Sequence, residues 1–111
     1  MTEKKHIGVE IFNILKLSST ILQKELIRLL EDKGFKKHKI YLYLRYILVI
    51  PIPLEKSGFL GIPYEIQTEP MISRRKDEIK NEICIELNEE WNDVDEKSVI
   101  DLFDKYNPDK Y

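Results

Sequence analysis

The chain has 111 residues, of which 42% are hydrophobic and 34% are charged, and its formal net charge is -2. This length allows one domain with its own core, and the hydrophobic content argues against a disordered chain. A single cysteine excludes an internal disulfide, and the longest apolar run falls short of the about 20 residues of a membrane-spanning helix. We therefore expect one α+β domain, residues 1–111, in the reducing cytoplasm or in a eukaryotic nucleus, without a signal peptide or a membrane partner.

The positive and negative charges separate along the chain. Residues 1–56 carry 11 Lys+Arg against 6 Asp+Glu, whereas residues 57–111 carry 7 against 14. A basic half and an acidic half indicate either two surfaces with different partners or halves that neutralise each other in the fold. The distribution alone leaves both interpretations open.

Two segments near the N-terminus have helical periodicity. Residues 6–17 place apolar side chains at i, i+4, i+7 and i+8, and we interpret them as a helix although their first half also alternates as a strand does. Residues 20–33 form the most regular helical pattern; the hydroxyls of residues 18–20 precede it as caps, and Gly34 supplies a left-handed stop. The expected buried stripe of this second helix is Leu22, Leu26, Leu29 and Leu30.

The segment 36–50 fits two structures. Its apolar and tyrosine residues alternate as in a strand, and composition favours that interpretation. The preceding helices favour a third helix, whose apolar face would consist of Ile40, Tyr43, Leu44 and Ile47. Pro51 and Pro53 end either structure, because proline lacks a backbone donor and restricts the residue before it.

The second half of the chain predicts a small antiparallel sheet. Residues 52–63 are a connection containing glycine and proline, long enough for a hairpin loop or a wing. Residues 64–69 and 82–87 alternate as half-exposed strands, and we expect them to pair around a charged turn at 73–78.

The last segment has the pattern of an acidic helix. Asp93 is followed three residues later by Glu96, which is the spacing of a capping box. One apolar face follows, and Asn-Pro at 107–108 ends the helix; the face consists of Val99, Leu102, Phe103 and Tyr106.

Residue types that catalyse reactions or bind metals are sparse. The only histidines and cysteine are His6, His38 and Cys84. Cys84 lies between two isoleucines on a predicted strand, which is typical of a small buried residue, and His38 lies among lysines, which favours a solvated or phosphate-facing ring. We expect no enzymatic activity, no cofactor and no metal site.

The clearest candidate site follows Gly34, where lysines, a histidine and an arginine are interleaved with tyrosines. Lysines bind phosphates through counterion release, and tyrosines offer stacking faces or hydrogen bonds. An ordinary solvated surface can have the same composition. The nucleic-acid-binding residues that we expect in this stretch are Lys33, Lys36, Lys37, His38, Lys39, Tyr41, Tyr43 and Arg45.

If the first three segments are all helices, their order resembles that of the winged-helix superfamily. The resemblance covers about residues 6–70, which contain in order a helix, a capped helix, a tight turn, a basic third segment and a glycine-containing loop. A strand and an acidic helix follow in 71–111. The resemblance implies that Lys36–Ile47 enters the major groove of DNA while a wing around Lys56–Gly61 contacts the backbone, which adds Lys56 to the site. It thus implies winged-helix-like helices, a small antiparallel sheet and a C-terminal helix.

A second function is suggested by the apolar run at 47–54 and the residues after it. A contiguous apolar surface usually marks a partner site, and winged helices also act as protein adaptors. We expect either a small non-enzymatic module that binds DNA or RNA, or a subunit, adaptor or inhibitor that docks onto a larger assembly, with a homodimer also open. The expected partner-binding residues are Ile50, Ile52, Leu54, Phe59 and Leu60.

Overall fold

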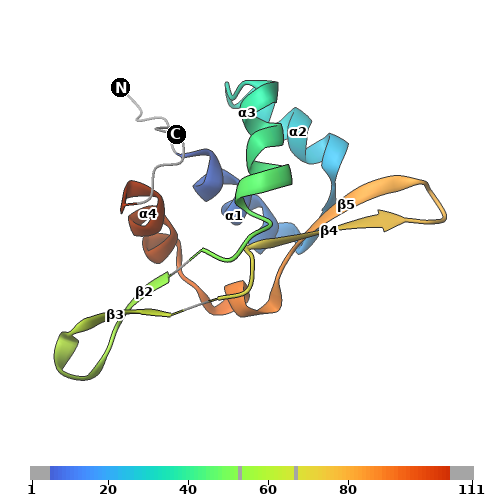
Figure 1. Ribbon diagram of the computed structural model, residues 1–111. Coiled ribbons are helices and arrows are strands. Elements are labelled where there is room, and N and C mark those ends of the chain that lie inside the picture. The colour runs from blue at the N-terminus through green and yellow to red at the C-terminus, as the bar shows by residue number, and fades with distance from the viewer. Residues whose placement is uncertain (1–5, 53, 67, 106–111) are drawn as a thin grey trace.

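Helices and small antiparallel sheets follow one another along the chain (Figure 1). The computed structural model describes residues 6–52, 54–66 and 68–105, and these form four α-helices, a three-stranded sheet and a two-stranded sheet. This is the α+β class expected from the sequence. Across these ranges, no helix combines the length and the apolar character that crossing a lipid bilayer requires.

Helix α1, Ile7–Ser18, confirms the helical interpretation of the N-terminal segment. His6 precedes it in an extended conformation, and its Nδ1 accepts a hydrogen bond of 3.0 Å from the backbone N–H of Gly8. The imidazole thus satisfies one of the free donors of the first turn. The side chains that α1 contributes to the core are Ile7, Val9, Ile11, Phe12 and Leu15.

The second helix is shorter than predicted, because its expected first residues form a strand. Thr20–Leu22 is strand β1, which pairs antiparallel with β5, Glu82–Leu87, and helix α2 spans Gln23–Asp32. The predicted capping role of residues 18–20 is therefore wrong, since Leu22 precedes α2 and makes no side-chain capping bond. Pairing with a strand near the other end of the chain overrides the local start signal.

The buried stripe of helix α2 differs from the predicted one, and Leu22 belongs to β1, where it is half-buried. Leu26 and Leu30 are buried as expected, whereas Leu29 is 37% exposed and Ile27 is buried in its place. The buried positions follow the i, i+3, i+4 spacing of one helix face, from which Leu29 is rotated away. Gly34 has a φ of 97° and ends the helix as predicted.

The ambiguous third segment is a helix. Helix α3, Lys37–Leu42, continues directly into a π-helical segment, Tyr43–Ile47, and the backbone N–H of Leu48 donates to the carbonyl of Tyr43 over 2.9 Å. The face proposed for the helical alternative is buried in full: Ile40, Tyr43, Leu44 and Ile47. The strand interpretation is therefore wrong, because packing against the core outweighs the β propensity of tyrosine and isoleucine.

The three-stranded sheet has the order β1-β5-β4, so the first strand pairs with the last one. Strand β4, Ile72–Asp77, lies where the sequence predicted a charged turn, and it pairs antiparallel with β5. The predicted turn at 73–78 is wrong, because β4 is an edge strand with a largely solvated surface, where charged residues are tolerated.

A second hairpin is inserted between α3 and β4. Strands β2, Leu54–Ser57, and β3, Pro63–Ile66, pair only with each other among the described residues. The connection expected at 52–63 therefore contains strand β2, and only residues 58–62 form the hairpin turn. The expected pairing of 64–69 with 82–87 is wrong, because β5 pairs with β1 and β4. The two hairpins, β2–β3 and β4–β5, extend from opposite sides of the helical body (Figure 1).

Helix α4, Glu96–Lys105, closes the described chain. Asp95, rather than the predicted Asp93, caps it: Asp95 Oδ1 accepts a hydrogen bond of 2.9 Å from the backbone N–H of Ser98. Hydrogen bonds from Ser98 lower the pKa of the Asp95 carboxyl, because they stabilise its charged form. Val99, Leu102 and Phe103 are buried as expected, and Tyr106 lies outside the described residues.

Helices α1 and α4 approach each other closely at Gly8. A Cβ built on Gly8 would lie 2.4 Å from the Cζ atom of Phe103, whose ring is buried. The same ring stacks on His6, with centroids 4.6 Å apart and planes inclined by 14°. Only a glycine leaves room for this contact between the N-terminus and the C-terminal helix.

Adding a methyl group at Gly8 tests that contact. We expect Gly8→Ala to lower the free energy of unfolding by about 1–3 kcal/mol, because overpacking against the Phe103 ring outweighs the better helix propensity of alanine. Urea denaturation followed by circular dichroism measures the change. In a Phe103→Leu background the same substitution should cost less, and an equal cost in both backgrounds would contradict the predicted clash.

Candidate functional site

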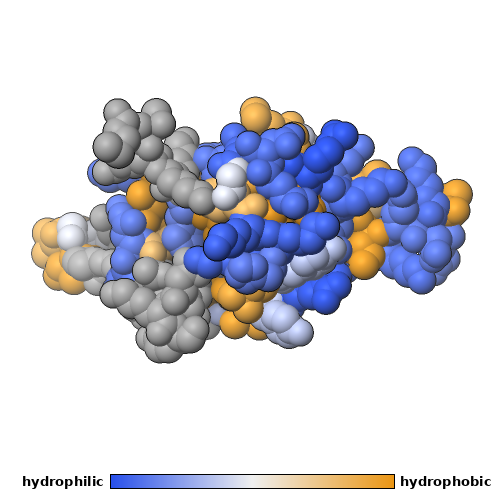
Figure 2. Space-filling model, turned by 90° about the horizontal axis from the view of Figure 1, so that it is seen from above, coloured by the Kyte–Doolittle hydropathy of each residue, from blue (hydrophilic) through white to orange (hydrophobic). Residues whose placement is uncertain are grey.

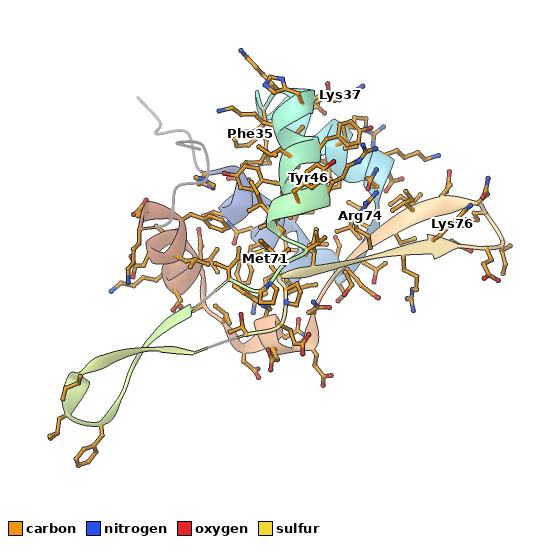
Figure 3. The ribbon with its side chains drawn as sticks, in the orientation of Figure 1. Phe35, Lys37, Tyr46, Met71, Arg74 and Lys76 are labelled. Atoms are coloured by element: carbon orange, nitrogen blue, oxygen red, sulfur yellow. The ribbon has the colours of Figure 1, made fainter. Side chains whose placement is uncertain are left out.

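The outer face of α3 and its π-helical continuation is the most basic surface that the sequence places in one element. No Asp or Glu occurs between Asp32 and Glu55. The buried side of the helix packs on the core, so its charged residues and Tyr46 lie on the side facing solvent (Figure 3). The charged face therefore has a rigid support, as a functional site generally requires.

The cations predicted in this stretch occupy different parts of the helix. Lys36, Lys37, His38 and Lys39 are all exposed and fan out around its N-terminal end, where Figure 3 shows Lys37 at the tip. Among the residues that the structure describes, no carboxylate lies within ion-pair distance of Lys36 or Lys37. These two ammonium groups are therefore available to an external anion.

Lys33 has a partner within the protein. Its Nζ lies 3.3 Å from Oε2 of Glu10 on α1, and the Lys33 side chain is half exposed. An ion pair this open to solvent is weak and readily exchanged. Lys33 lies at the margin of the site, where it links α2 to α1.

Arg45 and Tyr41 form a pair one helical turn apart. The Cζ atom of Arg45 lies 4.6 Å from the centroid of the Tyr41 ring, within cation–π range. Arg45 is exposed, and Tyr41 is partly buried against the core. Because Lys37, Tyr41 and Arg45 are spaced by four residues, they follow one line on the helix surface.

Tyr43 does not belong to the exposed site, in contrast to the prediction. It is fully buried, and its hydroxyl lies 3.0 Å from Nε2 of His6. Nδ1 of His6 accepts a hydrogen bond from the backbone N–H of Gly8, so the proton of the neutral imidazole is on Nε2. The Nε2–H group therefore donates a hydrogen bond to the tyrosine oxygen. Tyr43 therefore anchors α3 to the start of α1, and the exposed tyrosine of the π-helical segment is Tyr46, at 65% exposure.

Two cations of β4 extend the basic surface, and the sequence analysis missed them by assigning their segment to a turn. Arg74 and Lys76 alternate with Ser73 and Arg75, so they share a face of the strand with the buried Ile72. Both are exposed, and Figure 3 shows them along β4 beyond the end of α3. The alternation that begins at Ile72 is the signal that could have identified them.

Contacts with the helices fix the position of β4. The backbone N–H of Ile72 donates to the carbonyl of Leu48, just after the π-helical segment, over 3.1 Å. Arg74 Nε donates to Oε1 of the buried Gln23 at the start of α2 over 3.2 Å. The basic residues of α3 and β4 are thus held on one connected framework.

Arg75, the remaining arginine of β4, does not extend the site. Arg75 points to the opposite face of the sheet, where its Nη2 lies 3.3 Å from Oε2 of Glu86. The side chain of Lys56 lies outside the described part of the structure, and its backbone belongs to β2. The predicted link between Lys56 and the α3 surface therefore stays a prediction.

The predicted partner-binding residues are divided between core and surface. Ile52 is buried, so its assignment to an exposed partner surface is wrong; Ile50 is half exposed, and the Leu54 side chain lies outside the described part. Phe59 and Leu60 are exposed by 88% and 80% at the turn of the β2–β3 hairpin. Figure 2 shows apolar atoms at that end of the molecule.

No catalytic arrangement is assembled around the residues considered in the sequence analysis. His38 is exposed on α3, and Cys84 on β5 is half-buried rather than fully buried as predicted. In the described ranges, no three His, Cys, Asp or Glu residues are grouped so that they could hold a metal ion. The chemistry that the site offers is therefore that of cations and aromatic rings.

Compared with known proteins, the chain matches no family model, no curated protein and no solved structure.

The different roles of the two neighbouring tyrosines can be tested by removing one hydroxyl at a time. We expect Tyr43→Phe to lower the free energy of unfolding by about 1–2 kcal/mol, because it removes the hydrogen bond to His6 from a buried site. Tyr46→Phe on the exposed face should change it by less than about 0.5 kcal/mol. Urea denaturation measures both, and equal effects would place Tyr43 outside the core network.

Proposed function

We propose that this protein is a non-enzymatic nucleic-acid-binding module of winged-helix type, with duplex DNA as its ligand and α3 as its recognition helix. The observation that carries the proposal is the exposed face of α3, basic and free of carboxylates in its sequence, continuing into Arg74 and Lys76 of β4. An α-helix about 10–12 Å across fits the major groove, which is about 12 Å wide.

The order of the elements supports the winged-helix assignment. Helix, strand, helix, helix and a strand pair follow one another, and β5 lies between β1 and β4 in the sheet. The winged-helix resemblance implies the three helices and a following strand pair; strand β1 and its pairing with β5 are not part of the expectation. In this proposal the wing is the β4–β5 hairpin instead of the loop expected around Lys56–Gly61, and β2–β3 is an insertion between the recognition helix and the sheet.

Two sets of cations have separate roles in the proposed complex. Lys36, Lys37 and Lys39 at the start of α3 contact phosphates at the rim of the groove and release counterions. Arg74 and Lys76, on the strand that leads toward the turn of the wing, contact the backbone beyond the groove. The acidic residues of α4 and of the preceding segment 89–95 lie away from α3 in sequence and limit nonspecific adhesion.

A matched pair of charge reversals tests the proposal. Lys37 and Lys97 are exposed lysines in the first turns of α3 and α4, so Lys→Glu changes the same charge in the same helical context. We expect Lys37→Glu to weaken binding to a fluorescent mixed-sequence duplex at least about tenfold at low salt. The slope of log K against log salt should become shallower by about 1, and Lys97→Glu should change neither value.

The same titration contains the results that would overturn the proposal. Absence of duplex binding at low salt, or equal losses for Lys37→Glu and Lys97→Glu, would remove the assigned surface. Single-stranded DNA and RNA of the same length serve as parallel ligands. Tighter binding to a single strand than to the duplex would argue against a helix in the major groove and for stacking on Tyr41 and Tyr46.

A protein partner is the second candidate function, favoured by the turn of the β2–β3 hairpin. Phe59, Leu60 and Ile62 expose between 63% and 88% of their surface there. Leu60 also has a φ of 63°, a left-handed conformation that a leucine rarely adopts and that stores strain. Contiguous exposed apolar residues usually mark a partner site, and strained backbone clusters at functional sites.

We expect the double substitution Phe59→Ser/Leu60→Asn to abolish capture of a specific partner from cell extract without lowering stability, since asparagine tolerates the left-handed conformation better than leucine. Leu17→Asn is the control, because Leu17 is a 90% exposed leucine on α1. Quantitative affinity capture compares the three proteins. An unchanged set of captured proteins in the double variant would exclude the hairpin turn as the docking element.

A further inference from the structure

Arg45 differs from every other cation on the recognition helix. The stretch between Asp32 and Glu55 contains four lysines and this single arginine. Lysine is a mobile point charge, whereas arginine carries a planar fork of five N–H donors. Among the cations between Asp32 and Glu55, only Arg45 has the chemistry to donate two parallel hydrogen bonds to one base.

The side chain of Arg45 is held in place by Tyr41. The guanidinium Cζ lies 4.6 Å from the ring centroid, and the ring itself packs against the core. A cation–π contact uses the flat face of the guanidinium, whereas hydrogen bonds are donated from its edge. Stacking on Tyr41 therefore orders the side chain in advance and leaves its N–H edge available to a ligand.

The surroundings of Arg45 leave the N–H edge of its guanidinium group available to a ligand and hold this part of the helix in place. Tyr41 is the partner that the structure records for Arg45, and within the described ranges no carboxylate reaches it. Arg45 lies in the π-helical segment Tyr43–Ile47, and such segments occur frequently at functional sites. The hydrogen bond between Leu48 and Ile72 ties this end of the helix to the sheet.

We infer that Arg45, ordered by stacking on Tyr41, reads a guanine in the major groove by donating to its O6 and N7 atoms, while the lysines of α3 contact phosphates. The inference rests on the proposed function, since it requires α3 to enter the groove of a duplex. Guanine matches the guanidinium group because it is the base that presents two acceptors, O6 and N7, side by side in the major groove. One position of the bound sequence is therefore specified as guanine.

Selection from a pool of duplexes with a randomised core, using the intact protein, tests the inference. We expect the wild type to enrich duplexes that carry guanine at one position. Arg45→Lys should lose that enrichment, while its affinity for unselected DNA stays within about twofold of the wild-type affinity. Tyr41→Leu should weaken the guanine preference without removing a charge. Arg75→Lys is the control, because that arginine pairs with Glu86 on the other face of the sheet, and it should enrich the same guanine as the wild type.

Replacing the enriched guanine by 7-deazaguanine isolates the contact, because only the N7 acceptor is lost. Wild-type binding should weaken about tenfold, as expected for loss of one partner of a bidentate contact, whereas Arg45→Lys should bind both duplexes equally. Thermal denaturation shows that each variant is folded. If Tyr41→Leu does not fold, Arg45→Lys and the base analogue decide by themselves.

The possible outcomes separate the inference from the proposed function. Duplex binding that depends on Lys37 but enriches no guanine overturns the inference alone. Guanine enrichment that persists in Arg45→Lys, or a base-analogue effect that is equal in wild type and Arg45→Lys, also overturns the inference alone. Failure to bind any duplex at low salt overturns the proposed function, and the inference with it.

Discussion

Burial of one face of α3 is the constraint on which the rest of the structure depends. Ile40, Tyr43, Leu44 and Ile47 insert into the core, and the Tyr43 hydroxyl is joined to His6 at the start of α1. Rotating α3 would expose four large side chains and break that hydrogen bond at a cost far above that of any single surface contact. Packing in the core therefore determines the orientation of the helix. The exposure of its charged face is a consequence of that orientation.

Contacts between distant parts of the chain hold this arrangement together. His6 caps α1, stacks on Phe103 of α4 and lies within hydrogen-bond distance of Tyr43 in the π-helical continuation of α3, so one side chain joins three helical segments. Strand β1 closes the sheet by pairing with β5. The supporting elements are thus linked through the core, while the turns of the two hairpins and the outer face of α3 lie at the surface.

The cations of the chain fall into two groups with different physical roles. Lys24 and Arg75 are paired with Glu82 and Glu86 of β5, and the hydrogen-bonded partner raises the pKa of the Lys24 amine. Those pairs join elements of the fold. Lys37 and Arg45 have no such carboxylate among the described residues, and they lie on the face that the core turns outward. Within the described part of the chain, the pair Lys24–Glu82 thus joins the basic half to the acidic half, whereas Arg75–Glu86 lies within the acidic half.

The sequence by itself determined the α+β class, α1, most of α2, the stop at Gly34 and the basic character of the segment after it, because periodicity, turn residues and charge are local properties. It could not decide between helix and strand for 36–50, since both patterns bury the same kinds of residue. It also assigned residues 73–78 to a turn and included Tyr43 in the exposed site. The tertiary structure decided these points because β pairing and burial depend on partners far along the chain, which no local pattern contains.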